Sequence, residues 1–393
     1  MTPQETRARH RAAWPLSLMR VRRVVVKVGT RVLASTESGL EEGRLRRLAR
    51  QVAAFRKQGR EVLLVSSGAI AAGLAKLGLH RRPRAMPAKQ AAAAVGQSRL
   101  MWAYEKAFSR HGLTVAQVLL TRDDLANRRR FLNARATLQT LLAQGVIPVI
   151  NENDTVAVEE IRFGDNDTLA ALVTNLIEAD LLVILSDVDG LYTADPRKDP
   201  AARLIPVVER VTPEVLAMAG EARTQEGTGG MLSKVLTARR VARSGLPTVI
   251  LNGTRGQALS RLLAGRPAGT LFLPTETRLT SRKHWIAYTL RPKGRVVVDE
   301  GARRAVVERG KSLLPSGLLR VEGHFGIGDA VVCADERGRV FAKGLANYSS
   351  AEMARLCKVK TSQIQDVLGY TYTDEIIHRD NLVVLEPEMA EGT

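Results

Sequence analysis

Two kinds of hydrophobic pattern alternate along the first two thirds of the chain. Short runs of aliphatic and β-branched residues predict buried strands within RVVVKVGT (23–30), EVLLVSS (61–67), LTVAQVLL (113–120), GVIPVINEN (145–153) and DLLVILS (180–186). Between them, apolar positions recur at the helical period over 43–58, 68–78, 88–110, 133–143 and the segment after Asp167. Strands that alternate with amphipathic helices are typical of a mainly parallel sheet with helices on both faces. We therefore predict an α/β fold, a three-layer αβα sandwich.

The pattern changes after about residue 275. Beyond it, short strands separated by glycine-rich turns predict a small, mostly β module with one helix over 301–310. The first 20 residues are rich in arginine and have no hydrophobic period. We expect a disordered basic extension at 1–20, a main α/β domain at 21–275, a linker at 276–294, the β module at 295–380 and a C-terminal tail at 381–393.

The chain is long and strongly basic. Its 393 residues, 45% of them hydrophobic, can bury a sizeable core, and its net charge of +19 favours anionic partners such as nucleotides, acidic metabolites or nucleic acid. The arginines are dispersed, however, and RRR at 128–130 has no interleaved aromatic residues, which weakens a nucleic-acid interpretation. Because we find neither a membrane-spanning run of roughly 20 apolar residues nor a secretory signal, we expect a cytoplasmic protein without a membrane partner.

Polar residues gather where the predicted strands end. In an open parallel sheet, ligands bind beyond the carboxyl ends of the strands, so these positions are the first candidates for a site. They are Lys27, Gly29 and Thr30; Ser66, Ser67 and Gly68; Asn151, Glu152, Asn153 and Asp154; and Ser186 and Asp187. Glycine turns at Gly68 and at 227–230 precede helices and offer free backbone N–H groups to a phosphate or a carboxylate. Each feature alone also has an ordinary structural explanation, as a turn, a cap or a solvated charge.

The stretch FGDNDTLAAL, residues 163–172, places Asp165, Asn166 and Asp167 at the start of a helical pattern. One such side chain is enough to cap a helix, so the surplus carboxylate needs another explanation. Lys27, Lys234 and the two glycine turns together form a candidate phosphate clamp, and Asp167 is the anion that would hold both lysines. We expect Asp165 and Asn166 to face the substrate instead.

The motifs of common phosphoryl-transfer enzymes are missing. GTGGMLSK at 227–234 lacks the residue order of a Walker loop, and H-R-D does not occur together with D-F-G. A hydroxyl acceptor would profit from a general base, whereas a carboxylate acceptor is already ionised at pH 7 and needs none. Two lysines, backbone N–H groups and Mg²⁺ carried by the nucleotide would neutralise the repulsion between such an acceptor and a triphosphate.

Six stretches, in order along the chain, resemble the glutamate 5-kinase family of the amino-acid kinase fold. They are VVVKVGT, SSGAIAAG, NENDTV, FGDNDTLAA, SDVDGLYTADPR and GTGGMLSKVLTA. The C-terminal module is similar to a PUA domain, so the resemblance covers roughly residues 21–380. It implies ATP-dependent phosphorylation of the side-chain carboxylate of L-glutamate to L-glutamyl 5-phosphate, the first step of proline biosynthesis. Mg²⁺, feedback inhibition by proline and a homo-oligomer, dimer or tetramer, are implied only by the family.

The resemblance also implies roles for single residues. Lys27 and Lys234 would contact the transferring phosphoryl group, with Asp167 orienting both. The residues around glutamate would be Ser67, Gly68, Ala69, Asn151, Asp154, Asp165 and Asn166. The residues that hold ATP would be Lys27, Gly29, Ser186, Asp187, Gly227, Thr228, Gly229, Gly230, Met231 and Lys234. No separate metal site is expected, because Mg²⁺ would arrive with the nucleotide.

Two alternatives stay open. Another enzyme of the same fold could phosphorylate aspartate, acetylglutamate, carbamate or a nucleotide; the acidic pair with amides in NENDTV argues against it, since it suits an α-ammonium as well as a carboxylate. From a different class, the chain could bind RNA through its PUA-like module, given its positive charge. The six kinase-like stretches argue against RNA binding as the main function.

Overall fold

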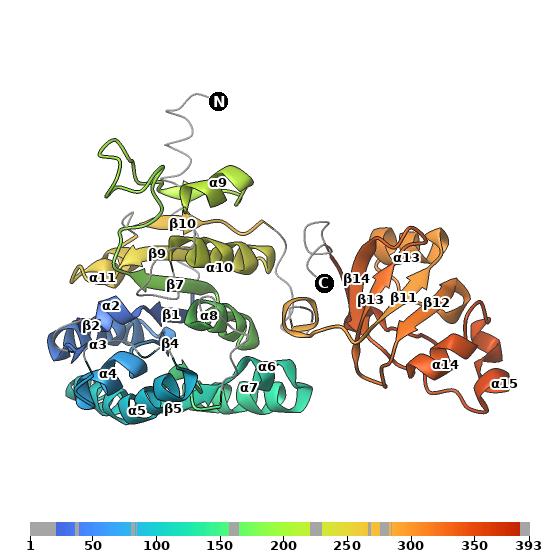
Figure 1. Cartoon of the computed structure of the whole chain (residues 1–393), viewed down its shortest axis with the longest axis horizontal. Helices are drawn as coiled ribbons and strands as arrows, with labels where there is room; N and C mark the ends of the chain where they lie inside the picture. Colours follow the sequence, from blue (N-terminus) through green and yellow to red (C-terminus); the bar gives the residue numbers. More distant parts are fainter. Residues whose placement is uncertain are drawn as a thin grey trace. The chain divides into compact units, whose positions relative to one another are not determined.

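The computed structural model describes residues 21–35, 39–79, 83, 85–156, 165–220, 230–265, 269–275, 283 and 285–385. The chain divides into two compact units, Met1–Arg278 and Leu279–Thr393 (Figure 1). The predicted extension at 1–20, the turn residues 227–229 and the end of the predicted tail, from 386 onward, lie outside the described residues.

An eight-stranded sheet forms the centre of the first unit, in the order β5-β6-β4-β1-β7-β9-β10-β8. Its strands are β1 (Arg23–Val28), β4 (Glu61–Ser66), β5 (Val115–Leu120), β6 (Ile147–Glu152), β7 (Leu181–Ser186), β8 (Val207–Val208), β9 (Thr248–Asn252) and β10 (Thr270–Phe272). Among these strands, only the β9–β10 pair is antiparallel. The predicted mainly parallel sheet is therefore confirmed, with β1 near its middle.

Helices cover both faces of this sheet, which confirms the three-layer prediction. The helices are α2 (Thr30–Leu33), α3 (Glu42–Lys57), α4 (Ala69–Lys76), α5 (Met86–Phe108), α6 (Arg122–Ala126), α7 (Arg128–Ala143), α8 (Asp165–Leu176), α9 (Pro213–Met218), α10 (Met231–Arg243) and α11 (Ala258–Leu263). Val24, Val26 and Val28 of β1 share a hydrophobic cluster with residues of α3, α5 and α11. Because side chains alternate along a strand, Val25 and Lys27 face the opposite side, where α8 packs against β1 and α10.

The second unit contains a five-stranded sheet in the order β12-β11-β13-β14-β15. Its elements are the π-helical turn η2 (Trp285–Thr289), β11 (Gly294–Val298), α13 (Glu300–Arg309), β12 (Leu318–Gly323), β13 (Ala330–Ala334), β14 (Val340–Leu345), α14 (Ser350–Arg355), α15 (Ile364–Leu368) and β15 (Leu382–Val384). Its own hydrophobic cluster includes Val296, Cys333 and Tyr348, all fully buried. The expected small, mostly β module is present.

Helices α4 and α5 cross at a contact that needs glycine on both sides. A Cβ atom added to Gly73 would lie 1.8 Å from the carbonyl oxygen of Ala92, and one added to Gly96 would lie 1.8 Å from that of Ala69. The two helices therefore touch backbone to backbone. Because α4 begins directly after β4, at Gly68 with φ of 110°, this crossing holds the middle of α5 beside the carboxyl end of the sheet.

We expect Gly96→Ala to lower the free energy of unfolding by about 1–3 kcal/mol, because two helix backbones must separate to admit the methyl group. Urea unfolding of the full chain measures the effect. Gly43→Ala in α3 is the matched control, since its Cβ would meet only the ends of arginine side chains, at 3.7 Å or more. Equal stability of the two variants would contradict the close crossing.

Candidate active site

The loops at the carboxyl edge of the central strands are tied together by backbone hydrogen bonds. The N–H of Ser67, after β4, donates to the carbonyl of Val28 in β1, and the N–H of Gly29, after β1, donates to the carbonyl of Leu185 in β7, each at 3.1 Å. Strands β6, β4, β1 and β7 are neighbours and parallel, so their carboxyl ends lie at one edge. The polar residues predicted from strand ends are therefore gathered in one place.

Asp167 joins three elements by a double ion pair. Its Oδ1 lies 2.7 Å from Lys27 Nζ of β1, and its Oδ2 lies 3.2 Å from Lys234 Nζ of α10. Ser233 Oγ donates to the same Oδ2 at 3.2 Å. The partners of both carboxylate oxygens are thus side chains of other elements, although Asp167 lies in the first turn of α8. The structure brings together the three residues that the sequence analysis grouped, and we call them the Lys–Asp–Lys triad.

The triad is buried and contains two cationic groups for one anionic group. Only 6% of Lys27, 1% of Asp167 and 5% of Lys234 is exposed. Burial by itself would raise the pKa of Asp167, but the two neighbouring ammonium groups bring it below its ordinary value. Burial lowers the pKa of Lys234, and the positive charge of Lys27 lowers it further, while Asp167 opposes the shift. Two cations face one anion, so the triad attracts a further negative charge.

We expect Asp167→Asn to lower the free energy of unfolding by about 3 kcal/mol or more at pH 7, because it leaves two buried ammonium groups without a counter-ion. The pKa of Asp167 is lower in the folded chain, so its contribution is complete above the ordinary carboxyl pKa and is lost as the pH falls through the folded value.

Urea unfolding of both proteins between pH 7 and pH 3 should therefore show a difference that shrinks below about pH 4. Asp123→Asn, at an exposed position in α6, is the control for loss of a carboxylate. A difference that stays constant across this range would contradict the buried ion pairs.

A chain of amide hydrogen bonds lies beside the triad. Asn166, the residue before Asp167, donates from Nδ2 to Ser67 Oγ at 3.0 Å and to Asn151 Oδ1 at 3.1 Å. Asn151 donates from its own Nδ2 to Gln97 Oε1 of α5 at 2.9 Å. Asn151 is almost fully buried, and the amide network joins the ends of β4 and β6 and the start of α8 to α5.

The residues predicted to bind the nucleotide lie at the end of β7 and at the start of α10. Ser186 ends β7 and is 5% exposed, and its hydroxyl donates to Asp187 Oδ1 at 3.2 Å. Asp187 also accepts a hydrogen bond at 3.0 Å from the guanidinium of Arg31, in α2. Partial burial would raise the pKa of Asp187, but this contact with Arg31 holds it below its ordinary value. Gly230 and Met231 form the beginning of α10, one turn before Lys234.

The structure tests only part of the remaining predicted set. Asp154 lies half-buried in the turn after β6, and Gly68 and Ala69 begin α4. The side chain of Asp165 and residues Gly227, Thr228 and Gly229 lie outside the described part of the chain, so their predicted contacts stay predictions. Among the residues that the structure describes, no group of three or more His, Cys, Asp or Glu side chains could hold a metal ion.

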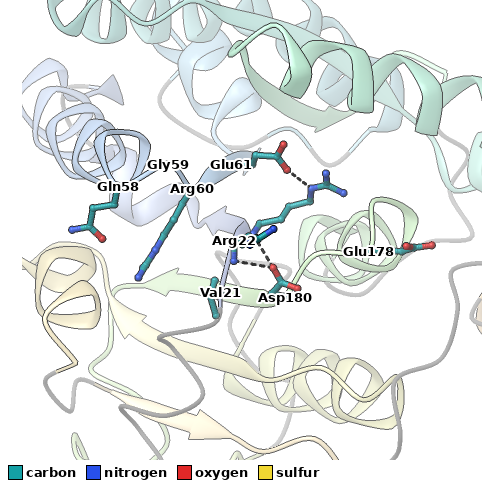
Figure 2. A pocket seen from close by; sticks show the side chains of 9 residues that line it. Val21, Arg22, Gln58, Gly59, Arg60, Glu61, Glu178 and Asp180 are labelled. Atoms are coloured by element: carbon teal, nitrogen blue, oxygen red, sulfur yellow. Dashed lines mark hydrogen bonds and ion pairs between the residues drawn. The ribbon is translucent and has the colours of Figure 1, made fainter.

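A separate pocket of about 690 Å³ lies at the opposite edge of the sheet, around the amino ends of β1 and β4 (Figure 2). There, Arg23 forms an ion pair with Glu61 at 2.6 Å, and the N–H groups of Arg22 and Arg23 both donate to Asp180. Its lining residues are Val21, Arg22, Arg23, Gln58, Gly59, Arg60, Glu61, Glu178 and Asp180. Its acidic and basic groups largely neutralise one another, and none of the predicted site residues lines it.

Three contacts at the site were not predicted from the sequence. They involve Ser233 at Asp167, Gln97 at Asn151 and Arg31 at Asp187. Ser233 could have been found, because it precedes Lys234 in the same motif. Gln97 lies inside a long helix, 54 residues from its partner, and no strand end or glycine turn marks it.

Comparison with known proteins shows the family of this chain. Residues 22–252 match the amino acid kinase family, and residues 294–368 match the PUA domain. A glutamate 5-kinase of Pelobacter propionicus is 57% identical over 367 residues, which are 93% of this chain and 98% of that protein. One of Geobacter metallireducens is 58% identical over 368 residues, 94% of this chain and 99% of that protein. The chain belongs to the glutamate 5-kinase family of amino acid kinases.

This family assignment covers the site as well as the fold. All three members of the triad fall within the part of the chain that matches the amino acid kinase family. The solved structure of a UMP kinase from Bacillus anthracis is also similar, with 16% identity and a TM-score of 0.46 over 65% of this chain and 97% of that one. A likeness of that size is too weak to bear on the chemistry.

In the described part of the chain, no helix has both the length and the apolar character needed to span a membrane.

Proposed function

We propose that this chain transfers the γ-phosphoryl group of ATP to the side-chain carboxylate of L-glutamate and forms L-glutamyl 5-phosphate, the first step of proline biosynthesis. The high identity to glutamate 5-kinases over nearly the whole chain supports the proposal. The observation that carries it is the Lys–Asp–Lys triad, which places an excess positive charge in a buried site at the carboxyl edge of the sheet.

The proposed chemistry is positioning combined with charge neutralisation. A carboxylate acceptor is ionised at pH 7, so no residue is needed to remove a proton from it. The obstacle is the repulsion between this acceptor and a triphosphate. Lys27 and Lys234 would contact the transferring phosphoryl group as charge develops on its oxygens, and Asp167 would hold both ammonium groups in place before the substrates arrive.

The substrates would lie on either side of the triad. For glutamate we propose Ser67, Gly68, Ala69, Asn151, Asp154, Asp165 and Asn166, because the described members of this set lie at the ends of β4 and β6 and the start of α8. For ATP we propose Lys27, Gly29, Ser186, Asp187, Gly227, Thr228, Gly229, Gly230, Met231 and Lys234, from the ends of β1 and β7 and the start of α10. Mg²⁺ would enter bound to the nucleotide and neutralise part of its charge.

Further properties are proposed from family membership alone. They are feedback inhibition by proline, assembly as a homo-oligomer and a cytoplasmic location, where ATP is available. We also propose that the first unit carries the catalysis, because the triad and the amide network both lie in it.

Hydroxylamine trapping tests the reaction directly. An acyl phosphate reacts with hydroxylamine to give a hydroxamate, which forms a coloured complex with added ferric ions. We expect ATP-dependent hydroxamate with glutamate and much less with aspartate or acetylglutamate. Equal or greater activity with either alternative would overturn the substrate assignment. No hydroxamate with any of the three would overturn the reaction class.

We expect Asp167→Asn to lower turnover by about a hundredfold or more, on the scale of losing one preorganised electrostatic contact. The variant keeps the size of the side chain, but it removes the charge that orients two lysines and turns one of the two acceptor oxygens into a donor. The same trapping assay measures it, and Asp123→Asn, in the exposed part of α6, should keep normal turnover. Normal turnover in Asp167→Asn would remove the orienting role from this mechanism.

A further inference from the structure

The orientation of every amide in the network beside the triad follows from one backbone group. The N–H of Glu152 can only donate, and it donates to Asn151 Oδ1 at 2.9 Å, so Asn151 Nδ2 points to Gln97. Gln97 must present its oxygen to that donor, which turns its Nε2 away from Asn151. By the same rule, Asn166 presents Nδ2 to Asn151 Oδ1 and to Ser67, which leaves its Oδ1 on the other side.

One donor and one acceptor of this network are left over. Gln97 Nε2 and Asn166 Oδ1 are both buried, and neither has a hydrogen-bond partner among the described residues. Leaving such an atom unsatisfied costs about 1–3 kcal/mol, and folded proteins satisfy nearly all of them. Both residues as wholes are only partly buried, so part of each side chain reaches the surface of the site.

The pair of atoms has the polarity of a free amino acid. A carboxylate accepts hydrogen bonds and complements Gln97 Nε2, whereas an ammonium donates and complements Asn166 Oδ1. A phosphate or a second carboxylate would satisfy only the first of them. The network is adjacent to the triad, because Asn166 and Asp167 are consecutive residues of α8.

We propose that Gln97 is a substrate-binding residue: its Nε2 donates to the α-carboxylate of the acceptor amino acid, while Asn166 Oδ1 accepts from the α-ammonium of the same molecule. This inference rests on the proposed function and adds to it a contact from α5, a helix that holds none of the residues assigned above. The backbone crossing at Gly96 places Gln97, the next residue, against the strand ends.

The variant Gln97→Glu separates recognition from packing. The carboxylate side chain that this substitution introduces keeps an oxygen for Asn151 Nδ2 and almost the same volume. It replaces the free donor of Gln97 by an acceptor, which repels the carboxylate of the substrate. We expect the KM for glutamate and the Kd for glutamate from calorimetry to rise about tenfold or more, the scale of one hydrogen bond to a charged group. The KM for ATP should stay near the wild-type value.

Two further variants complete the test. Ser98→Glu adds the same negative charge at the next position of α5, which is exposed, and should leave glutamate binding unchanged. Gln97→Ala also removes the acceptor of Asn151 and should lower the melting temperature as well as weaken binding. If Gln97→Glu binds glutamate as tightly as Ser98→Glu does while Gln97→Ala alone is impaired, Gln97 only packs and the inference is wrong.

The wild-type arm of the same experiment tests the proposed function. If the wild type binds and phosphorylates glutamate but Gln97→Glu does so equally well, only the inference fails. If the wild type prefers aspartate, the assigned substrate fails, and the ratio between Gln97→Glu and Ser98→Glu with aspartate still decides the role of Gln97. If the wild type binds no free amino acid, both proposals are wrong.

Discussion

A single buried carboxylate holds the candidate active site together. Asp167 receives Lys27 from a central strand and Lys234 from a helix that begins 64 residues further along the chain than Asp167 itself. Two buried ammonium groups repel each other and each resists loss of its hydration, so neither would be stable there without the shared anion. The carboxylate neutralises only one of the two charges. In the proposed reaction, the remaining charge attracts the phosphoryl group, so the interaction that stabilises the site would also set its chemistry.

The sheet and its helices place this ion pair by simple packing rules. Alternation along β1 sends Val24, Val26 and Val28 into the hydrophobic cluster and Lys27 to the face covered by α8. Hydrogen bonds of the Gly29 and Ser67 amides hold the loops after β1 and β4 at the same edge. On the other side, the glycine crossing of α4 and α5 brings a helix within reach of the amide network. The side chains that meet at the site are thus held by rigid elements rather than by long loops.

Hydrophobic periodicity was a good guide to the elements and a poorer guide to their ends. The predicted strand at 23–30 and helix at 43–58 correspond to Arg23–Val28 and Glu42–Lys57. The helix predicted at 133–143 begins earlier, at Arg128. The preceding short helix, Arg122–Ala126, was not predicted; it starts at a capping box between Thr121 and Asp124, a local hydrogen-bond pattern rather than a hydrophobic one.

The amino-acid sequence by itself determined the fold class and the membership of the triad, and it predicted the edge of the sheet where a ligand would bind. The hydrophobic period, the residues at strand ends and the surplus carboxylate can each be recognised in a short stretch of sequence. They therefore do not depend on how the elements pack together. Only the tertiary structure decided that Gln97 meets Asn151, that Arg31 contacts Asp187 and that the amides leave one donor and one acceptor over. These contacts join segments up to 156 residues apart, and an amide side chain can present either its donor or its acceptor until a neighbour such as the Glu152 N–H selects one.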